Sequence, residues 1–189
     1  MKILLINNHS THLKELISKF KNVKVIDFEK IKKGEENKFD AIVLSGGSSF
    51  PIIYYEKKYS KELDIIRKSD KPILGICLGF ELINFAFGEK LKLMNKREKG
   101  KIKIKQISKD KLFSLLPNEF EVYGSHRWIV PKNRFLKSIA KSKDCIEAVK
   151  HPEKNIWGVQ FHPEVFVKKS HAERILKNFL KIVKEKNMN

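Results

Sequence analysis

Short apolar runs alternate along the first half of the chain with segments whose apolar residues recur at helical spacing. The runs predict strands at residues 2–7, 23–28, 39–44 and 72–76. The helical spacing predicts helices at residues 13–20, 60–67 and 78–87. An unbroken run such as 2–7 is typical of a strand that is buried on both faces of a parallel sheet. The pattern predicts one α/β domain over residues 1–189, with a mostly parallel central sheet and helices on both faces.

The second half of the chain predicts further strands and one long helix. Residues 89–94 and 101–107 predict two strands joined by a charged turn at 95–100, and residues 120–123 predict a third strand. Residues 145–149 and 156–161 predict a hairpin. An apolar stripe from about residue 169 to residue 186 predicts the last helix, with Ser170 and Glu173 as its capping box.

Lysine dominates the charge of the chain. Lys and Arg together number 40 against 22 acidic residues, which gives a net charge of +18, and only five of the basic residues are arginine. The basic residues are spread along the chain, whereas recognition of phosphates and bases favours arginine. We therefore expect a lysine-rich solvated surface and no nucleic-acid partner.

Hydropathy and cysteine usage limit the location of the protein. No apolar run approaches the length of a membrane span, so no membrane partner is expected. The two cysteines, Cys77 and Cys145, do not make a disulfide framework. These features predict a cytoplasmic protein in a reducing compartment. Cys145 lies in an apolar strand and is expected to be inert core.

Cys77 stands where the strand at 72–76 changes into the helix at 78–87. Gly75 and Gly79 flank it, two residues before and two residues after. Small residues there allow a sharp strand-to-helix turn that holds the residue between them strained and exposed, as in a nucleophile elbow. The amides that open the helix favour a thiolate and can bind a developing oxyanion. Cys77 is therefore the candidate nucleophile, and a buried structural cysteine is the alternative.

A cysteine nucleophile needs a histidine base and a group that orients the base. His162 and Glu164 stand two residues apart after the predicted strand at 156–161 and provide such a pair. His126 is the main competitor, but no carboxylate accompanies it in the same way. His151 also precedes Pro and Glu, but it falls in the loop of the predicted hairpin, where packing would not hold a base.

The segments Gly-Ile-Cys-Leu-Gly at 75–79 and Gln-Phe-His-Pro-Glu at 160–164 together resemble the class I (triad) glutamine amidotransferases. The resemblance covers nearly the whole chain, because the two motifs lie about as far apart as in that family. It implies a flavodoxin-like amidotransferase fold and hydrolysis of the side-chain amide of L-glutamine. It also implies that Cys77 is the nucleophile, His162 the base and Glu164 the group that orients His162.

The resemblance also implies an oxyanion hole and a substrate site. The backbone amides of Gly47 and Leu78 would form the hole, and the substrate would contact four residues, Gly46, Glu81, Ser125 and His126. The family commonly has Gln where this chain has Glu81. A carboxylate there can bind an α-ammonium group but repels a second carboxylate, so the substrate is glutamine or another γ-glutamyl compound. No metal ligands are predicted.

Ammonia made by such an enzyme needs an acceptor. The chain has no synthetase domain and no phosphate-binding P-loop pattern, so the resemblance implies a separate synthetase subunit of the ATP pyrophosphatase type. ATP and Mg²⁺ would belong to that partner, and no cofactor is expected on this chain. The bulky loop at 49–55 would line the pocket or meet the partner.

Within the family, the His-Pro-Glu-Val and Ser-His segments are most similar to the stand-alone amidotransferase subunits of GMP synthase. Three alternatives remain open: the small subunit of anthranilate or aminodeoxychorismate synthase, a γ-glutamyl hydrolase or peptidase that acts without a partner, and a non-catalytic regulatory subunit on the same fold.

Overall fold

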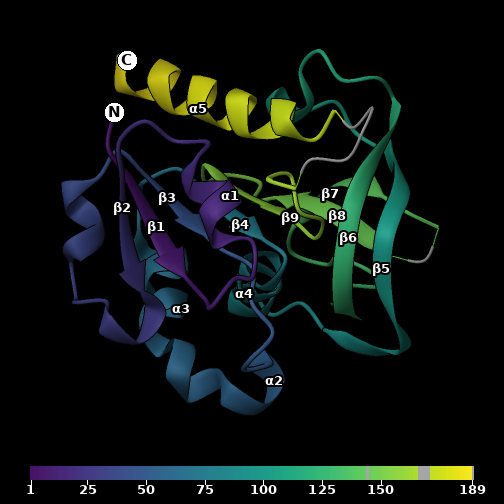
Figure 1. The fold of residues 1–189 in the computed structure, drawn as a ribbon, viewed down its shortest axis with the longest axis horizontal. Helices are drawn as coiled ribbons and strands as arrows, with labels where there is room; N and C mark the ends of the chain where they lie inside the picture. The colour runs from purple at the N-terminus through teal and green to yellow at the C-terminus, as the bar shows by residue number, and fades with distance from the viewer. Residues whose placement is uncertain (144, 166–170, 189) are drawn as a thin grey trace.

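A nine-stranded sheet forms the centre of the computed structural model, which describes residues 1–143, 145–165 and 171–188. The strand order is β2-β1-β3-β4-β9-β8-β7-β5-β6 (Figure 1). The strands are β1 (Ile3–Asn7), β2 (Val23–Asp27), β3 (Ala41–Leu44), β4 (Ile73–Ile76), β5 (Lys92–Gln106), β6 (Glu119–Ile129), β7 (Lys137–Lys141), β8 (Ile146–Lys150) and β9 (Ile156–Val159). The helices are α1 (Leu13–Ile17), α2 (Ile52–Tyr55), α3 (Ser60–Lys68), α4 (Leu78–Ala86) and α5 (Glu173–Met188).

The strands β2, β1, β3, β4 and β9 pair in parallel. Every residue of β3, β4 and β9 is buried, which explains their unbroken apolar sequences. The predicted parallel sheet is confirmed for these strands. Their carboxyl ends meet at one edge of the sheet, where ligands of open α/β folds bind. Asn8, Ser45, Cys77 and Gln160 are the residues that follow β1, β3, β4 and β9 there.

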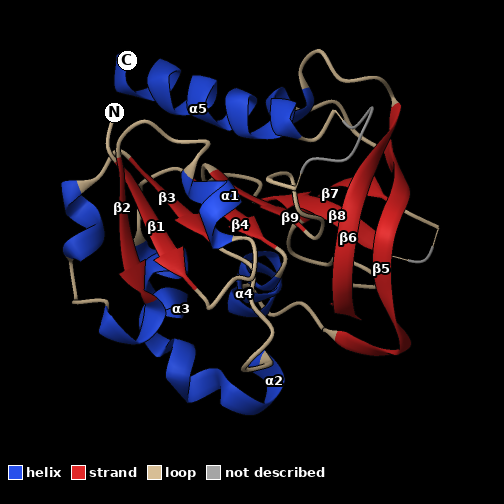
Figure 2. Ribbon diagram, in the orientation of Figure 1, coloured by secondary structure: helices blue, strands red, loops and turns tan. Residues whose placement is uncertain are grey.

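Helices cover both faces of the sheet, as predicted (Figure 2). One apolar cluster joins alternate strand residues such as Leu5 and Val43 to α1 and α5. A second cluster joins the other strand residues, such as Ile6 and Ile42, to α3 and α4. Helix α5 begins at Glu173, and the predicted start near residue 169 with its cap Ser170 lies outside the described residues. No helix among the described residues is long and apolar enough to cross a bilayer.

The remaining strands β8, β7, β5 and β6 extend the sheet in antiparallel fashion from β9. The predicted charged turn at 95–100 is wrong, because these residues lie within the single long strand β5. Strand β5 pairs along its length with β6, with an irregular register between Leu93 and Glu98. Strand β6 also continues through 124–128, beyond its predicted end at 123. The prediction fails because a charged strand with a solvated face resembles a turn in sequence.

The antiparallel part of the sheet curls. In Figure 1 the long strands β5 and β6 run steeply across the direction of β7 and β8. Val130, directly after β6, forms an isolated antiparallel bridge with Ile146 at the start of β8. The curl therefore brings β6 back to β8, although β7 and β5 separate these strands in the sheet order.

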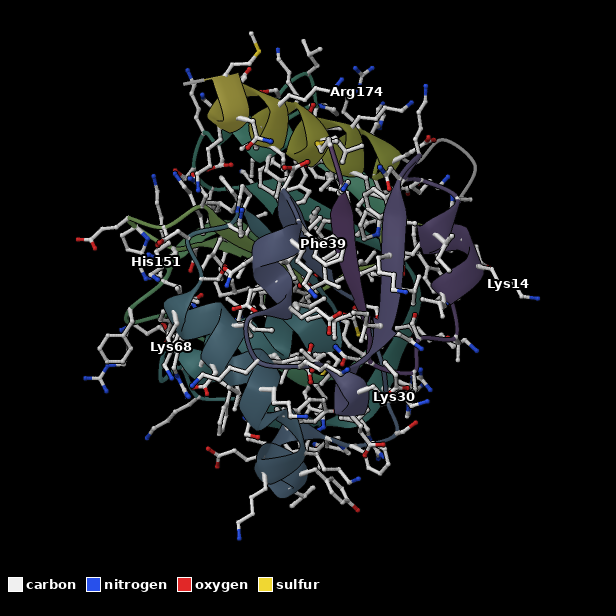
Figure 3. All side chains as sticks on the ribbon, turned by 90° about the vertical axis from the view of Figure 1, so that its left-hand side faces the viewer. Lys14, Lys30, Phe39, Lys68, His151 and Arg174 are labelled. Carbon is white, nitrogen blue, oxygen red and sulfur yellow. The ribbon has the colours of Figure 1, made fainter. Side chains whose placement is uncertain are left out.

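Basic side chains project from many elements. Lys14 on α1, Lys30 after β2, Lys68 on α3 and Arg174 on α5 lie in different parts of the face in Figure 3. This distribution agrees with a solvated lysine-rich surface. The hairpin between β8 and β9 forms as predicted, and His151 in its loop accepts backbone N–H groups of Glu153 and Lys154. The role of His151 is therefore local to this loop.

Candidate active site

Cys77 forms the sharp turn between β4 and α4. Its backbone has φ 51° and ψ −104°, a strained conformation for a residue with a side chain. The flanking glycines allow the turn: a Cβ at Gly75 would lie 2.4 Å from the carbonyl oxygen of Gly79, and a Cβ at Gly79 would lie 2.5 Å from that of Leu44. The amide of Cys77 donates to the carbonyl of Val159 at 2.9 Å, which holds the turn against β9.

His162 and Glu164 lie beside this turn. His162 follows β9, the parallel neighbour of β4, so the sheet itself brings its side chain to Cys77. The backbone amide of His162 donates to the carbonyl of Tyr123 at 2.8 Å, and its Nδ1 lies 2.8 Å from Oε1 of Glu164. Both side chains are buried. Because an ionised carboxylate only accepts, Nδ1 carries the proton and Nε2 remains for the hydrogen bond with Cys77.

The surroundings of His162 favour its protonated form. Burial lowers the pKa of His162, but the hydrogen bonds with Cys77 and with Glu164 more than offset this effect and raise the pKa to about 10. The ring also packs edge-on against His12 at a centroid distance of 5.1 Å. The imidazole is thus fixed by its backbone, by Glu164 and by a neighbouring ring.

The glycine pair after β3 passes close to the cysteine and the histidine. A Cβ at Gly46 would lie 2.9 Å from Cε1 of His162 and 3.3 Å from Cβ of Cys77, so only glycine fits between them. A Cβ at Gly47 would lie 2.0 Å from the carbonyl oxygen of Asn8. Gly47 and Leu78, the two residues expected to form the oxyanion hole, line the same cavity as Cys77.

This cavity has a volume of about 370 Å³ and opens beside the thiol. Its lining comes from the glycine loop, the 50–54 segment, α4, β5 and β6. The rings of Tyr54 and Trp128 approach each other at a centroid distance of 6.1 Å. The bulky loop at 49–55 therefore contributes to the pocket wall, one of its two expected roles, through Phe50, Pro51 and Tyr54.

Glu81 lines the cavity from α4 and is only 4% exposed. Its Oε1 accepts a hydrogen bond from Nε2 of Gln160 at 3.3 Å. Burial raises the pKa of Glu81 to about 8, although the bond from Gln160 opposes the shift. The sequence-based expectation of a carboxylate at this place is therefore revised, because the side chain is a neutral acid at pH 7.

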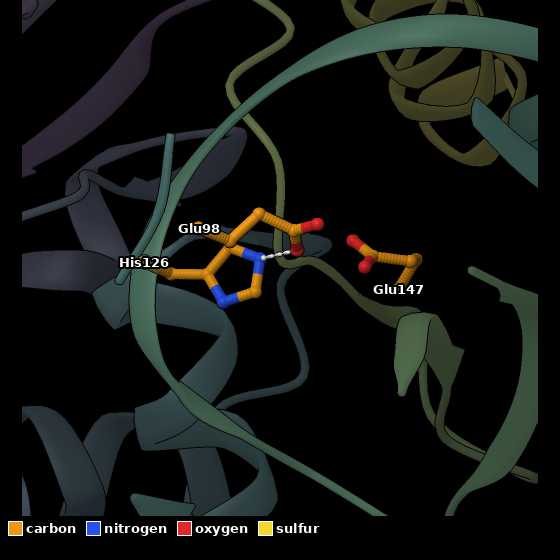
Figure 4. A group of neighbouring side chains, drawn as sticks. All are labelled: Glu98, His126 and Glu147. Carbon is orange, nitrogen blue, oxygen red and sulfur yellow. Dashed lines mark ion pairs between the residues drawn. The ribbon is translucent and has the colours of Figure 1, made fainter. Parts of the chain in front are cut away.

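Ser125 and His126 lie on β6 and line the cavity with Cys77. The carbonyl of Ser125 lies 3.9 Å from the Cys77 sulfur. The ring of His126 is turned toward Glu98, with Nε2 at 3.1 Å from Oε2 of that residue (Figure 4). Burial lowers the pKa of His126 to about 4, and its bond with the Trp128 carbonyl only partly opposes this. His126 is thus not placed as the partner of the thiol.

Arg97 is a pocket residue that the sequence alone did not reveal. Its Nη2 donates to Oγ of Ser125 at 2.9 Å, and the side chain lines both the main cavity and a smaller hollow of about 30 Å³ that His162 also lines. The expected turn at 95–100 hid this position. The pairing of β5 with the Ser-His segment of β6 is what brings Arg97 to the pocket.

Comparisons with known proteins agree with this geometry. The family model described as glutamine amidotransferase class-I matches residues 4–183. The chain is 40% identical over 158 residues to the glutamine-hydrolyzing subunit of GMP synthase from Methanococcus vannielii, over 82% of this chain and 79% of the relative. It is likewise 40% identical over 148 residues to the protein of that name from Pyrococcus abyssi, over 76% of each.

Solved structures give the same result for the fold. A putative GMP synthase subunit from Thermoplasma acidophilum has a TM-score of 0.87 at 26% identity, over 100% of this chain and 96% of the other. A glutamine amidotransferase from Thermotoga maritima has a TM-score of 0.74 at 21% identity, over 100% and 86% of the two chains, which shows the fold alone. With the family model spanning nearly all of its residues, the chain belongs to the class-I glutamine amidotransferase family.

Proposed function

We propose that the chain, as one domain over residues 1–189, hydrolyses the side-chain amide of L-glutamine and delivers the ammonia to a separate synthetase subunit. The observation that carries this proposal is the buried relay from Glu164 through His162 to a strained Cys77 at the cavity. The relatives that are named as glutamine-hydrolyzing subunits of GMP synthase favour GMP formation as the use of the ammonia.

The reaction begins with attack of the Cys77 sulfur on the amide carbon of glutamine. The raised pKa of His162 favours an imidazolium beside a thiolate, the reactive form of a cysteine nucleophile. The amides of Gly47 and Leu78 bind the oxyanion of the tetrahedral intermediate. His162 then donates its Nε2 proton to the leaving nitrogen, and ammonia departs from a glutamyl thioester on Cys77.

Water completes the cycle. His162 removes a proton from water, the resulting hydroxide attacks the thioester, and glutamate leaves as the Cys77 sulfur is released. Glu164 keeps Nδ1 of His162 protonated and stabilises the imidazolium in both halves of the reaction. Side chains and backbone amides perform each step, so the hydrolysis needs no cofactor on this chain, and ATP and Mg²⁺ are used by the partner.

Three parts of the pocket wall recognise the amino-acid end of the substrate. Neutral Glu81 presents a hydrogen-bonding acid inside the cavity, with the same shape as the glutamine side chain common in the family. Arg97 provides a cation for the α-carboxylate, at the wall formed by Ser125. Gly46 contributes the close backbone approach, and the backbone of Ser125 and His126 forms the opposite wall.

The partner and the location complete the proposal. We infer a synthetase subunit of the ATP pyrophosphatase type that aminates XMP, and a cytoplasmic location where thiols stay reduced. The test is reconstitution of the purified chain with such a partner, ATP, Mg²⁺, XMP and L-glutamine. GMP formation that requires this chain supports the proposal. Ammonia release that instead responds only to the large subunit of anthranilate or aminodeoxychorismate synthase, or proceeds at full rate without any partner, would overturn the assigned acceptor.

A further inference from the structure

Three side chains from three strands converge behind the wall of the substrate pocket. Glu98 on β5, His126 on β6 and Glu147 on β8 each offer a donor atom, and these atoms all lie within 4.8 Å of one another (Figure 4). Glu98 and His126 are direct partners in the β5–β6 ladder. Glu147 arrives from the other direction, because the curl of the sheet joins Val130 after β6 to Ile146 on β8.

Glu147 is fully buried at 0% exposure. Its Oε1 accepts from the thiol of Cys145 at 3.1 Å. Its Oε2 is also buried and has no hydrogen-bond partner in the part of the chain that the structure describes. Figure 4 shows the carboxylate aimed at His126 and Glu98. A buried carboxylate oxygen that lacks a donor is costly, so something positive is needed between these groups.

The orientation of His126 leads to the same requirement. Its Nδ1 lies 3.2 Å from the carbonyl oxygen of Trp128, and because a carbonyl only accepts, Nδ1 carries the proton. A neutral ring then presents the lone pair of Nε2 to Oε2 of Glu98 at 3.1 Å. Two acceptors therefore face each other, and Nε2 itself has no hydrogen-bond partner among the described residues. A histidine whose outer N–H is held by a backbone carbonyl is the usual arrangement at a metal ion.

We propose that Glu98, His126 and Glu147 bind a divalent transition-metal ion. One imidazole and two carboxylates suit Zn²⁺, Mn²⁺ or Fe²⁺. Donors about 2.1 Å from a tetrahedral ion lie about 3.4 Å apart, so the three side chains close inward by rotation when the ion binds. Cys145 and the Trp128 carbonyl hold the ligands in place from outside the site.

The ion would act on the pocket wall and not on the reacting atoms. It would link β5, which carries Arg97, to β6, which carries Ser125, and tie both to β8. The site departs from the sequence-based expectation of no metal ligands on this chain. It is independent of the proposed glutamine chemistry, because it uses neither Cys77 nor His162.

Zinc binding by the purified full-length chain tests the site. The protein is treated with a chelator, dialysed and titrated with ZnCl₂ by calorimetry, and thermal unfolding is followed with and without Zn²⁺. The titration uses the Cys77→Ala variant, because Cys77 and His162 offer zinc ligands of their own. We expect one ion per chain and a higher unfolding temperature with zinc.

Matched substitutions locate the ion. Glu147→Gln and the partly exposed Glu98→Gln, each in the Cys77→Ala background, should weaken zinc binding by about 100-fold or more and abolish the thermal shift. Glu121→Gln, on the solvated face of β6 beside Lys101, should retain both. The inference is overturned if the Cys77→Ala protein binds neither Zn²⁺ nor Mn²⁺, which would leave a shared proton in the cluster, or if Glu147→Gln and Glu98→Gln bind zinc as Glu121→Gln does.

Discussion

Nδ1 of His162 lies 2.8 Å from Oε1 of Glu164, and both side chains are buried at the carboxyl edge of the parallel strands. This bond fixes which ring nitrogen faces Cys77. It also contributes, with the Cys77 bond, to raising the pKa of His162 against the effect of burial. The pair therefore determines both the orientation and the charge of the proposed base.

Removal of the charge on Glu164 should impair turnover more than binding. In Glu164→Gln the amide can no longer stabilise the imidazolium, so we expect kcat for glutamine hydrolysis to fall by about 100-fold or more with a smaller change in KM. The pKa of His162 should also fall, which histidine NMR titration measures. Glu153→Gln in the exposed hairpin loop is the control. Unchanged kcat in Glu164→Gln would show that His162 does not depend on this carboxylate.

Glu81 should behave as a neutral group at pH 7. Since burial raises its pKa to about 8, the side chain is protonated below that pH and ionises above it. Glu81→Gln should keep a wild-type kcat/KM at pH 7, while only the wild-type protein should lose kcat/KM as the pH rises past 8. The measurement is kcat/KM across this pH range. A large loss at pH 7 in Glu81→Gln would instead show that the substrate needs a carboxylate there.

Arg97 should control substrate affinity. If its guanidinium binds the α-carboxylate of glutamine, Arg97→Gln should raise KM by about tenfold or more and change kcat less. Arg67→Gln is a matched control, because Arg67 is an exposed residue of α3 whose Nε donates to the Ala86 carbonyl, away from the pocket lining. Glutaminamide, which lacks the carboxylate, should be affected little by Arg97→Gln. Equal effects on both substrates would contradict the assigned role.

Glu62 should make stability depend on pH. It is 1% exposed, and burial raises its pKa to about 8, against a bond from Asn8 and with a further increase from Asp27. The folded state therefore holds a proton that the unfolded chain releases above its ordinary pKa of 4.5. The stabilisation is complete below pH 4.5 and is lost as the pH rises through 8, by up to about 1.4 kcal/mol per pH unit.

Urea unfolding of Glu62→Gln between these two pKa values measures this contribution. The variant should show a shallower loss of unfolding free energy than the wild type across that range. The exposed Glu56→Gln should follow the wild type. Parallel curves for Glu62→Gln and wild type would mean that Glu62 is not protonated in the folded protein.

Local features of the chain could be predicted well. The turn at Cys77 depends on Gly75 and Gly79, which lie within two residues of it, and the structure shows the expected strain. The closeness of His162 to Cys77 followed from two apolar runs that pair in parallel as β4 and β9. These inferences needed only sequence spacing and one strand pairing.

The features that could not be predicted from the sequence depend on long-range packing. The charged residues around Arg97 resemble a turn until β6 pairs with them, so β5 and its pocket residue were missed. The protonation of Glu81 depends on burial by several elements and on Gln160. The cluster of Glu98, His126 and Glu147 exists only because the sheet curls. None of these has a local sequence signal.

Covalent chemistry at Cys77 is the most direct test of the proposed function. The purified chain, alone and with its synthetase partner, is incubated with L-glutamine while ammonia release is measured, and mass spectrometry then locates the label left by a glutamine-analogue electrophile. We expect ammonia release and a single label on Cys77, both abolished by Cys77→Ala. Substantial ammonia release by Cys77→Ala, or an unlabelled Cys77 in an active wild-type protein, would contradict the proposal.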